Sequence, residues 1–205
     1  MSDFIKQLIE GRISTGRYDV ERDLTDEQVS ELVRLAARAP SAYNLQNWKF
    51  IAVRSAAAKA RLHAAAYGQQ QVLQAPVTYI VCGTLAAHEG LARALEPAVA
   101  AGILAPEFAE GWVAAATDSH QGNPQLQRDE ALRSASLAAM TLMLAAEGVG
   151  LATGPMSGFD AAAVSREFDL AANEVPVMLV TAGYPAPGNW PQKPRKPLPE
   201  VMAFA

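Results

Sequence analysis

Apolar residues follow a helical spacing at two places near the start of the chain. Over residues 3–10 they fall on one face of a short predicted helix. A second predicted helix begins at Thr25, and Gln28, three positions later, completes a capping box. Pro40 limits its extension, because the residue before a proline disfavours helical backbone angles. Alternating bulky residues then predict a strand over residues 48–54.

The longest helical pattern lies in the second half of the chain. Residues 129–147 are apolar nearly all the way round, which predicts a buried central helix ending at Gly148 and Gly150. Residues 76–82, PVTYIVC, form a nearly continuous β-branched and aromatic run that is typical of a buried central strand. Strands separated by helical stretches of unequal length favour an α+β fold over strict βαβ repeats. The other predicted elements are a helix over 56–66, a brief strand over 151–153, a helix over 161–168 and a strand over 175–183.

Two regions lack a clean periodicity. Glycines and prolines divide residues 86–122 into short helical pieces, so we expect a mobile, substrate-facing helical insertion there. Residues 185–205 are rich in proline and basic residues, so we expect an extended C-terminal tail. We expect the whole chain, residues 1–205, to form one domain. The residues that interrupt the insertion are Gly90, Pro97, Gly102, Pro106 and Gly111.

Composition narrows the class of protein. The 205 residues are 50% hydrophobic and 19% charged, which is enough apolar material for one substantial core. The net charge of -4 gives no electrostatic reason to expect nucleic acid or an anionic membrane as a partner. Cys82 is the single cysteine, so no internal disulfide forms. We see neither a secretory signal nor an apolar run of spanning length, and we expect a cytoplasmic protein.

The segment APSAYNLQNW, residues 39–48, joins the second predicted helix to the first predicted strand. It places Ser41, Asn44 and Gln46 at close spacing on a connection that Pro40 stiffens. Such a loop offers hydroxyl, amide and main-chain N–H groups to a flat ligand with polar edges. In isolation, Ser41 and Asn44 are better explained as turn formers.

Several kinds of catalytic motif are absent from the sequence. It contains no glycine-rich phosphate loop, no histidine or cysteine pair at metal-binding spacing and no nucleophile elbow. Cys82 lies inside a predicted buried strand, which makes it a core residue rather than a nucleophile. A chain with binding loops and no evident catalytic side chain often uses a cofactor for its chemistry.

Cationic residues gather near the two ends of the chain. Arginine suits bidentate phosphate recognition, and lysine adds a point charge. The alternative is that these residues are ordinary solvated surface charges. The two groups are Arg12 and Arg17, with Ser14 between them, and Lys193, Arg195 and Lys196, with prolines between them.

Five segments together resemble the nitroreductase family of flavin enzymes, in the order which that family has them. The loop at 39–48 is similar to the family's APS-x-x-N-x-Q-P-W segment. The sequences QAPVTYIV at 74–81 and TGPMSGFD at 153–160, with R-x-x-x-G at 12–16, are most similar to the subgroup that contains malonic semialdehyde reductases. The five segments are 12–18, 39–48, 68–76, 154–160 and 193–197.

The resemblance implies a fold, a cofactor and a reaction. It implies a mixed, mostly antiparallel sheet flanked by helices, in a homodimer with FMN at the subunit interface and the tail extending onto the partner subunit. NADH or NADPH would give hydride to flavin N5, and a small acceptor would then take it in a ping-pong reaction. No side chain need act as a catalyst, because the flavin carries the chemistry.

The resemblance also assigns roles to individual residues. Those near the chain ends would bind the FMN phosphate, those of the 39–48 loop would line the flavin of the partner subunit, and the rest would surround the ring. The phosphate residues are Arg12, Ile13, Ser14, Lys193 and Arg195; the loop residues are Pro40, Ser41, Ala42 and Asn44; Gln69, Gln71 and Gly16 lie at the pyrimidine edge; and Pro155, Met156, Ser157 and Gly158 pass behind the ring.

Three positions depart from the family pattern. Gly16 stands where many members have Lys or Arg, and Ser157 stands where many have Glu. Asn47 replaces the usual proline before the tryptophan. Loss of a cation near the pyrimidine would lower the flavin potential, unless the adjacent Arg17 supplies the charge. The changes at Gly16 and Ser157 recur in the semialdehyde-reductase-like subgroup.

Three functional hypotheses follow. The first is an FMN-dependent NAD(P)H oxidoreductase that acts on a nitro compound, a quinone or a small aldehyde such as malonic semialdehyde. The second is a flavin-binding store, carrier or sensor without turnover. The third is an α+β domain without a cofactor. No segment identifies a 2′-phosphate site, so the sequence does not indicate which nicotinamide is preferred.

Overall fold

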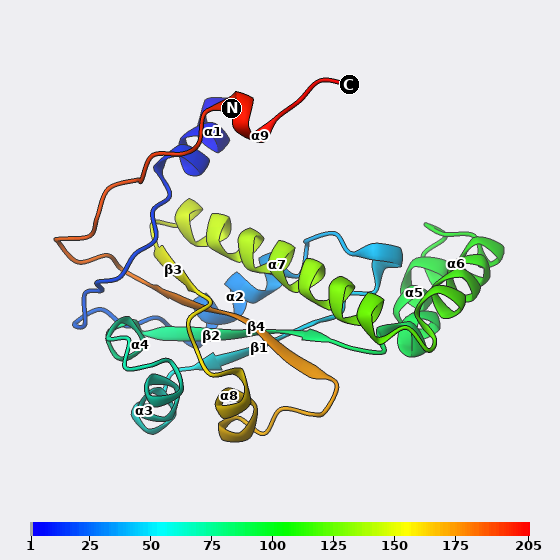
Figure 1. The fold of residues 1–205 in the computed structure, drawn as a ribbon, viewed down its shortest axis with the longest axis horizontal. Helices are drawn as coiled ribbons and strands as arrows, with labels where there is room; N and C mark the ends of the chain where they lie inside the picture. The colour runs from blue at the N-terminus through cyan, green and yellow to red at the C-terminus, as the bar shows by residue number, and fades with distance from the viewer. Residues whose placement is uncertain (1) are drawn as a thin grey trace.

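A four-stranded sheet forms the middle layer of the computed structural model, which describes residues 2–205. Each neighbouring pair of strands is antiparallel, and a parallel bridge between Ser14 and Thr153 adds to the outer edge of the sheet. The four strands are therefore antiparallel throughout (Figure 1), and within the described residues the parallel pairing of the expected mixed sheet is limited to this bridge. In spatial order the strands are β1 (Trp48–Val53), β2 (Val77–Thr84), β4 (Glu174–Gly183) and β3 (Ala152–Met156).

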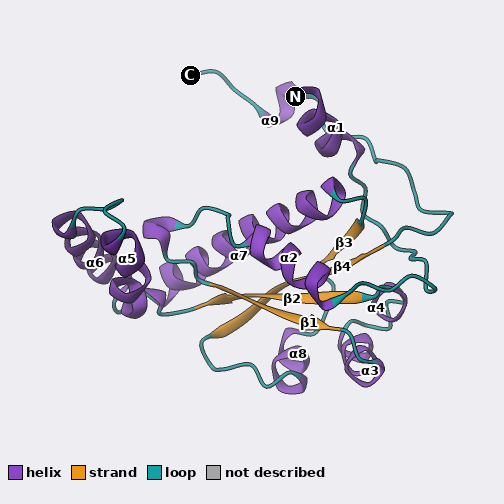
Figure 2. Cartoon of the chain, turned by 180° about the vertical axis from the view of Figure 1, so that it is seen from behind, coloured by secondary structure: helices purple, strands orange, loops and turns teal. Residues whose placement is uncertain are grey.

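Helices cover both faces of this sheet, as Figure 1 and Figure 2 show from opposite sides. On one face lie α7 (Pro124–Gly148) and α2 (Asp26–Ala36), which also pack against each other. On the other face lie α3 (Ala56–Ala65) and α8 (Ala161–Glu167), and the short helix α4 (Gln71–Gln74) leads into β2. The prediction of an α+β fold is confirmed.

Strand β2 is the centre of the core, as its apolar sequence predicts. Val77, Tyr79 and Val81 pack with α2 and α7, and Ile80 and Cys82 point to the opposite face. All five are fully buried. Burying one such apolar side chain stabilises the fold by about 1.5–3 kcal/mol, so a strand buried on both faces anchors both layers. The prediction that Cys82 is a core residue is confirmed, and burial raises the pKa of its thiol to about 12.

The central helix α7 begins earlier than predicted. The expected start at residue 129 is wrong, because Pro124 occupies the first turn, where a missing N–H costs nothing. Asn123 caps the helix, and its Oδ1 accepts a hydrogen bond from the Leu126 N–H at 3.1 Å. The helix packs so close to β2 that a Cβ on Gly83 would lie 2.5 Å from the Ala131 carbonyl oxygen.

The predicted capping box at the start of α2 is present. Thr25 Oγ1 accepts from the Gln28 N–H at 3.2 Å, and Gln28 Oε1 accepts from the Thr25 N–H at 2.9 Å. These two bonds pair N–H groups that the first turn of a helix otherwise leaves without partners. The short N-terminal helix α1 (Ser2–Gly11) lies beyond the C-terminal end of α7 (Figure 1).

Residues 86–122 fold into a helical group at the opposite end of α7 (Figure 1). Pro97 and Gly111 lie inside helices, so the expectation that they break the chain is wrong at these two positions. Packing between the two longer helices offsets the cost of the glycine and the proline. The elements are η2 (Ala87–Gly90), α5 (Leu91–Ala100) and α6 (Pro106–His120), which contact η1 (Ala42–Asn44).

The chain after β4 runs back beside the N-terminal segment. The Ala186 N–H donates to the Arg17 carbonyl at 3.0 Å, and Tyr18 and Pro185 form an antiparallel bridge. The tail is extended apart from α9 (Leu198–Val201), a single turn close to α1 (Figure 2). Within residues 2–205, no helix combines the length and apolar character that crossing a membrane requires.

Candidate functional site

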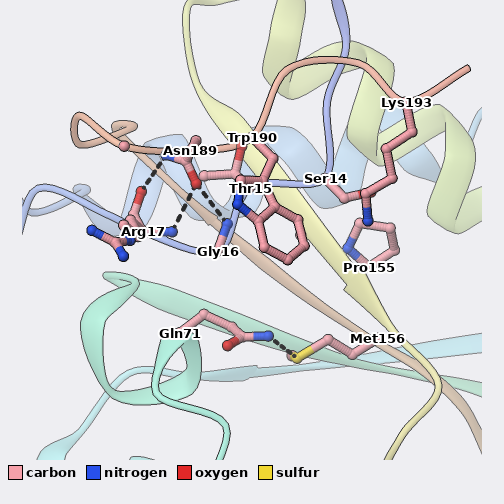
Figure 3. Close-up of a pocket in the computed structure, with 12 residues that line it drawn as sticks. Ser14, Thr15, Gly16, Arg17, Gln71, Pro155, Met156, Asn189, Trp190 and Lys193 are labelled. Carbon is pink, nitrogen blue, oxygen red and sulfur yellow. Dashed lines mark hydrogen bonds between the residues drawn. The ribbon is translucent and has the colours of Figure 1, made fainter.

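A pocket of about 300 Å³ opens where the N-terminal segment, β3 and the returning tail meet (Figure 3). This volume is at the lower end of the range of about 300–1,000 Å³ that is usual for small-molecule sites. Six of the residues that the resemblance assigns to the flavin line it, and no aspartate or glutamate does. The lining residues are Ser14, Thr15, Gly16, Arg17, Gln71, Gly154, Pro155, Met156, Gly188, Asn189, Trp190 and Lys193.

The rear wall of the pocket depends on a close approach between two backbones. The Thr15 N–H donates to the Thr153 carbonyl at 2.9 Å, which holds the N-terminal segment against β3. A Cβ on Gly154 would lie 2.2 Å from the Thr15 carbonyl oxygen. Only glycine fits at this position, since real Cβ atoms do not approach so closely.

A buried hydroxyl network supports the same wall from behind. Tyr18 is 3% exposed, and its hydroxyl lies 2.7 Å from Thr181 Oγ1. Thr181 Oγ1 in turn donates to the Gly154 carbonyl at 3.1 Å. Desolvation by burial raises the pKa of Tyr18, so its hydroxyl keeps the proton that the network requires.

The structure brings together the two cationic ends that the sequence analysis singled out. Gln192 in the tail donates to the Arg12 carbonyl at 2.8 Å, which places the tail beside Ser14. Lys193 lines the pocket, whereas the Arg195 guanidinium donates to the Lys193 carbonyl at 2.6 Å and does not line it. The Arg12 guanidinium donates to the Ile13 carbonyl at 3.2 Å. Ser14 and Lys193 thus form a polar, positively charged end of the pocket.

Two of the predicted glutamines lie at the other side of the pocket. Gln71 lines it and donates from Nε2 to the Met156 sulfur at 3.0 Å and to Gln69 Oε1 at 3.2 Å. Gln69 donates from Nε2 to the Gly158 carbonyl at 2.7 Å, behind the lining layer. Ser157, next to Met156, is exposed but does not line the pocket. An amide edge therefore faces the apolar surface of Pro155 and Met156.

The predicted residues Pro40, Ser41, Ala42 and Asn44 do not line this pocket in the described chain. They belong to a loop in which Tyr43, Asn44 and Gln46 all have left-handed backbone angles, with φ of 51°, 59° and 48°. The loop is held by the Ser41 hydroxyl, which accepts from the Gln46 N–H at 2.9 Å. Tyr43 also packs edge-on against Trp112 of α6, with ring centroids 6.4 Å apart. Such strain persists only where surrounding structure enforces it.

Sequence reasoning missed part of the pocket wall. Thr15 lies inside a singled-out segment but was not assigned, and Asn189 and Trp190 lie in a stretch judged to lack any pattern. A tryptophan directly after Gly188-Asn189 in a proline-rich tail is the signal that was available. No group of three or more potential metal ligands occurs within the part of the chain that the structure describes.

Comparison with known proteins is consistent with this geometry. The model of the Nitroreductase family matches residues 9–184. The chain is 34% identical over 206 residues to Bacillus subtilis MhqN, with all of both chains covered. It is 34% identical over 176 residues to B. subtilis YodC, covering 86% of this chain and 87% of the relative. Both relatives are assigned by name as NAD(P)H nitroreductases.

Solved structures share the fold over the full length. The structure of B. subtilis ydfN, assigned as a nitroreductase, has a TM-score of 0.93 at 32% identity, with 100% of both chains covered. A protein from Exiguobacterium sibiricum, also assigned as a nitroreductase and solved in complex with FMN, has a TM-score of 0.90 at 27% identity, covering 98% of this chain and 97% of that one. The chain therefore belongs to the nitroreductase family.

Proposed function

We propose that this chain is an FMN-dependent oxidoreductase that uses NAD(P)H to reduce a small acceptor. The observation that carries the proposal is the pocket beside β3, with a positively charged end, an amide edge and a flat apolar wall. The similarity to relatives assigned as NAD(P)H nitroreductases and to a structure in complex with FMN supports the same activity.

The residues present fit FMN in their chemistry. Ser14 and Lys193 would hold the phosphate at the positively charged end, where no carboxylate competes for them. Arg12 and Arg195 lie beside this end and would add charge after a change of rotamer. Ile13 would contribute its backbone. An added Cβ at Gly16 would meet nothing within 4 Å, so the N-terminal segment leaves room there for a ring against its backbone.

The ring would lie between an amide edge and an apolar wall. Gln71, backed by Gln69, would hydrogen-bond the pyrimidine edge beside Gly16. Pro155 and Met156, continued by Ser157 and Gly158, would pass behind the ring. When bound, FMN supplies the hydride chemistry, with the nicotinamide and then the acceptor using one pocket in turn. The contribution of the chain is to bind, orient and shield, and no side chain serves as a nucleophile.

We propose a homodimer in which the second subunit completes each site. Pro40, Ser41, Ala42 and Asn44 lie outside the pocket of their own chain, which is the arrangement expected if they line the pocket of a partner. Apolar side chains are exposed on α1, α7 and the tail. A dimer in which the tail extends onto the partner subunit would bury them. They are Phe4, Ile5 and Ile9 of α1, Leu137 and Met140 of α7, and Leu198, Val201, Met202 and Phe204 of the tail.

The acceptor is proposed to be a small aldehyde such as malonic semialdehyde, a quinone or a nitro compound. The helical group at residues 86–122 packs against the strained loop and would therefore face the acceptor in the partner's pocket. A flavin-binding role without turnover is the second candidate, because nothing in the binding geometry requires catalysis. Purified protein loaded with FMN should oxidise NADPH or NADH faster when one of these acceptors is added. A protein that binds FMN but oxidises neither NADPH nor NADH with any of these acceptors would favour the second candidate.

The phosphate assignment predicts weaker FMN binding in two variants. Each charge-assisted hydrogen bond is worth about 1.5–3 kcal/mol, so Arg12→Ala or Arg195→Ala should weaken FMN binding by about ten- to a hundredfold. Titration followed by flavin fluorescence measures this. Arg34→Ala is the matched control, because Arg34 pairs with Glu31 on α2 at 2.6 Å. Wild-type affinity in both test variants would rule out the assignment.

A further inference from the structure

Trp190 is exposed to an unusual degree for a tryptophan that lies in a pocket wall. Its relative exposure is 73%, although it lines the pocket. An indole buries much apolar surface when it finds a partner, and it contacts flat rings by stacking. A large aromatic group that is held in place but uncovered indicates a contact surface for a ligand.

Asn189 fixes the backbone that carries this indole. Its Oδ1 accepts from the Gly16 N–H at 2.9 Å and from the Arg17 N–H at 3.0 Å. Its Nδ2 donates to the Arg17 carbonyl (Figure 3) and to the Ala186 carbonyl, both at 2.9 Å. These four bonds use both donors and both acceptor positions of the amide, so the side chain works as a clip between tail and N-terminal segment.

The turn before the clip leaves little freedom to the tail. Gly188 has φ of +87°, which favours glycine. A Cβ at this position would also lie 3.1 Å from Arg17 Nη1. The chain therefore enters Asn189 in one direction, and the next residue, Trp190, projects over the pocket (Figure 3).

The indole is also oriented from its C-terminal side. The Lys193 ammonium lies 4.9 Å from the centroid of the Trp190 ring, a cation–π contact. Lys193 and Trp190 both line the pocket, so the positive end and the aromatic surface are adjacent. A ligand with an anionic group next to a planar ring matches this pair.

We propose that Trp190 is a ligand-contact residue against which a planar heteroaromatic ring stacks, and that Asn189 is the residue that positions it. The ring belongs to FMN or to the nicotinamide of the co-substrate. This inference rests on the proposed function, because that function supplies both rings. It gives the tail a binding role beyond the charges of Lys193 and Arg195.

The test uses full-length protein and two matched substitutions at one position. Trp190→Leu removes the ring but keeps apolar bulk, and Trp190→Phe keeps a ring. Trp190→Leu should raise the Kd for FMN, or the KM for NADPH at saturating FMN, about three- to tenfold, whereas Trp190→Phe should stay within twofold of wild type. A change in the Kd identifies the flavin ring as the stacking partner, and a change in the KM alone identifies the nicotinamide. Tyr67→Leu, at an aromatic residue that is 72% exposed and outside this pocket, is the control.

The positioning role requires a readout beyond folding. Asn189→Ala should reproduce the defect of Trp190→Leu, and the double variant should be no worse than either single variant, because both changes remove one contact. Asn189→Asp keeps both acceptor bonds but turns a carboxylate oxygen toward two carbonyl oxygens, so it should be no better than Asn189→Ala.

The failure of this inference is distinct from failure of the proposed function. Wild-type protein that binds no FMN would contradict the function itself. Wild-type protein that binds FMN and reacts with NADPH, together with an unchanged Kd and KM in Trp190→Leu, would overturn the stacking role alone. Additive effects in the double variant would overturn the positioning role of Asn189.

Discussion

Replacing Gly154 by alanine should be among the most damaging conservative changes near the pocket. The new methyl carbon would lie 2.2 Å from the Thr15 carbonyl oxygen, 2.7 Å from Thr181 Oγ1 and 3.2 Å from the Tyr18 hydroxyl. Two of these three neighbours are parts of a buried network, and the third is backbone. None of them is the free end of a flexible side chain, so the clash is relieved only when the N-terminal segment moves away from β3.

The magnitude follows from what that movement breaks. Overpacking a close contact costs about 1–3 kcal/mol. The movement also breaks the 2.9 Å hydrogen bond from the Thr15 N–H to the Thr153 carbonyl, which costs about 1 kcal/mol more. A hydroxyl of the network that is left without a partner adds about 1 kcal/mol. We therefore expect Gly154→Ala to lower the free energy of unfolding by about 3–5 kcal/mol.

Urea unfolding at one fixed protein concentration measures this loss. With a slope of about 2 kcal/mol per M, the midpoint should fall by roughly 2 M. Gly158→Ala is the control in the same segment, because a Cβ there would lie 3.8 Å from Gln69 Nε2 in ordinary contact. The control should stay within about 0.5 kcal/mol of wild type. A Gly154→Ala midpoint equal to that of the control would refute the close approach and the pocket wall built on it.

Two further predictions concern the fold. Thr25→Ala removes the hydroxyl of the capping box and should destabilise the protein by about 1 kcal/mol, measured by thermal or urea unfolding, whereas Thr25→Ser should keep most of the stability. Burial raises the pKa of Cys82 to about 12 in the folded protein, whereas the thiol of the unfolded chain loses its proton above about pH 8.5. Between these two pH values the free energy of unfolding should therefore fall by about 1.4 kcal/mol for each pH unit. Urea unfolding of both proteins at about pH 9 and pH 11 measures this slope. The free energy of unfolding of Cys82→Ala should fall less between these two pH values than that of the wild type, and an equal fall in both proteins would contradict the burial argument.

Local patterns were enough to predict most of the elements. The β2 strand was predictable because a nearly continuous apolar run has one stable environment, between two layers of helices. The α2 start was predictable because the capping box is a contact between neighbours in sequence. Errors arose where local rules compete with packing: Pro97 and Gly111 lie inside helices whose tertiary contacts outweigh their low helix propensity.

The candidate site was predictable only in part, since it is assembled across the length of the chain. Charge and residue type pointed to Ser14 and Lys193, and the structure places both in one pocket. The clip by Asn189 could not be predicted, because three of its four bonds join groups that lie 172 or 173 residues apart in sequence. The left-handed angles of Tyr43 and Gln46 were equally hidden, because neither residue type signals such a conformation.

The central claim is that this chain binds FMN and lets NAD(P)H reduce it. The most direct test is the absorption spectrum of the purified protein, reconstituted with FMN if necessary, before and after anaerobic addition of NADPH and then NADH. We predict oxidised-flavin bands that stay with the protein through gel filtration and bleach with at least one nicotinamide. Bands that persist with both would contradict the enzymatic claim, and a protein that retains no FMN would contradict the assignment of the pocket.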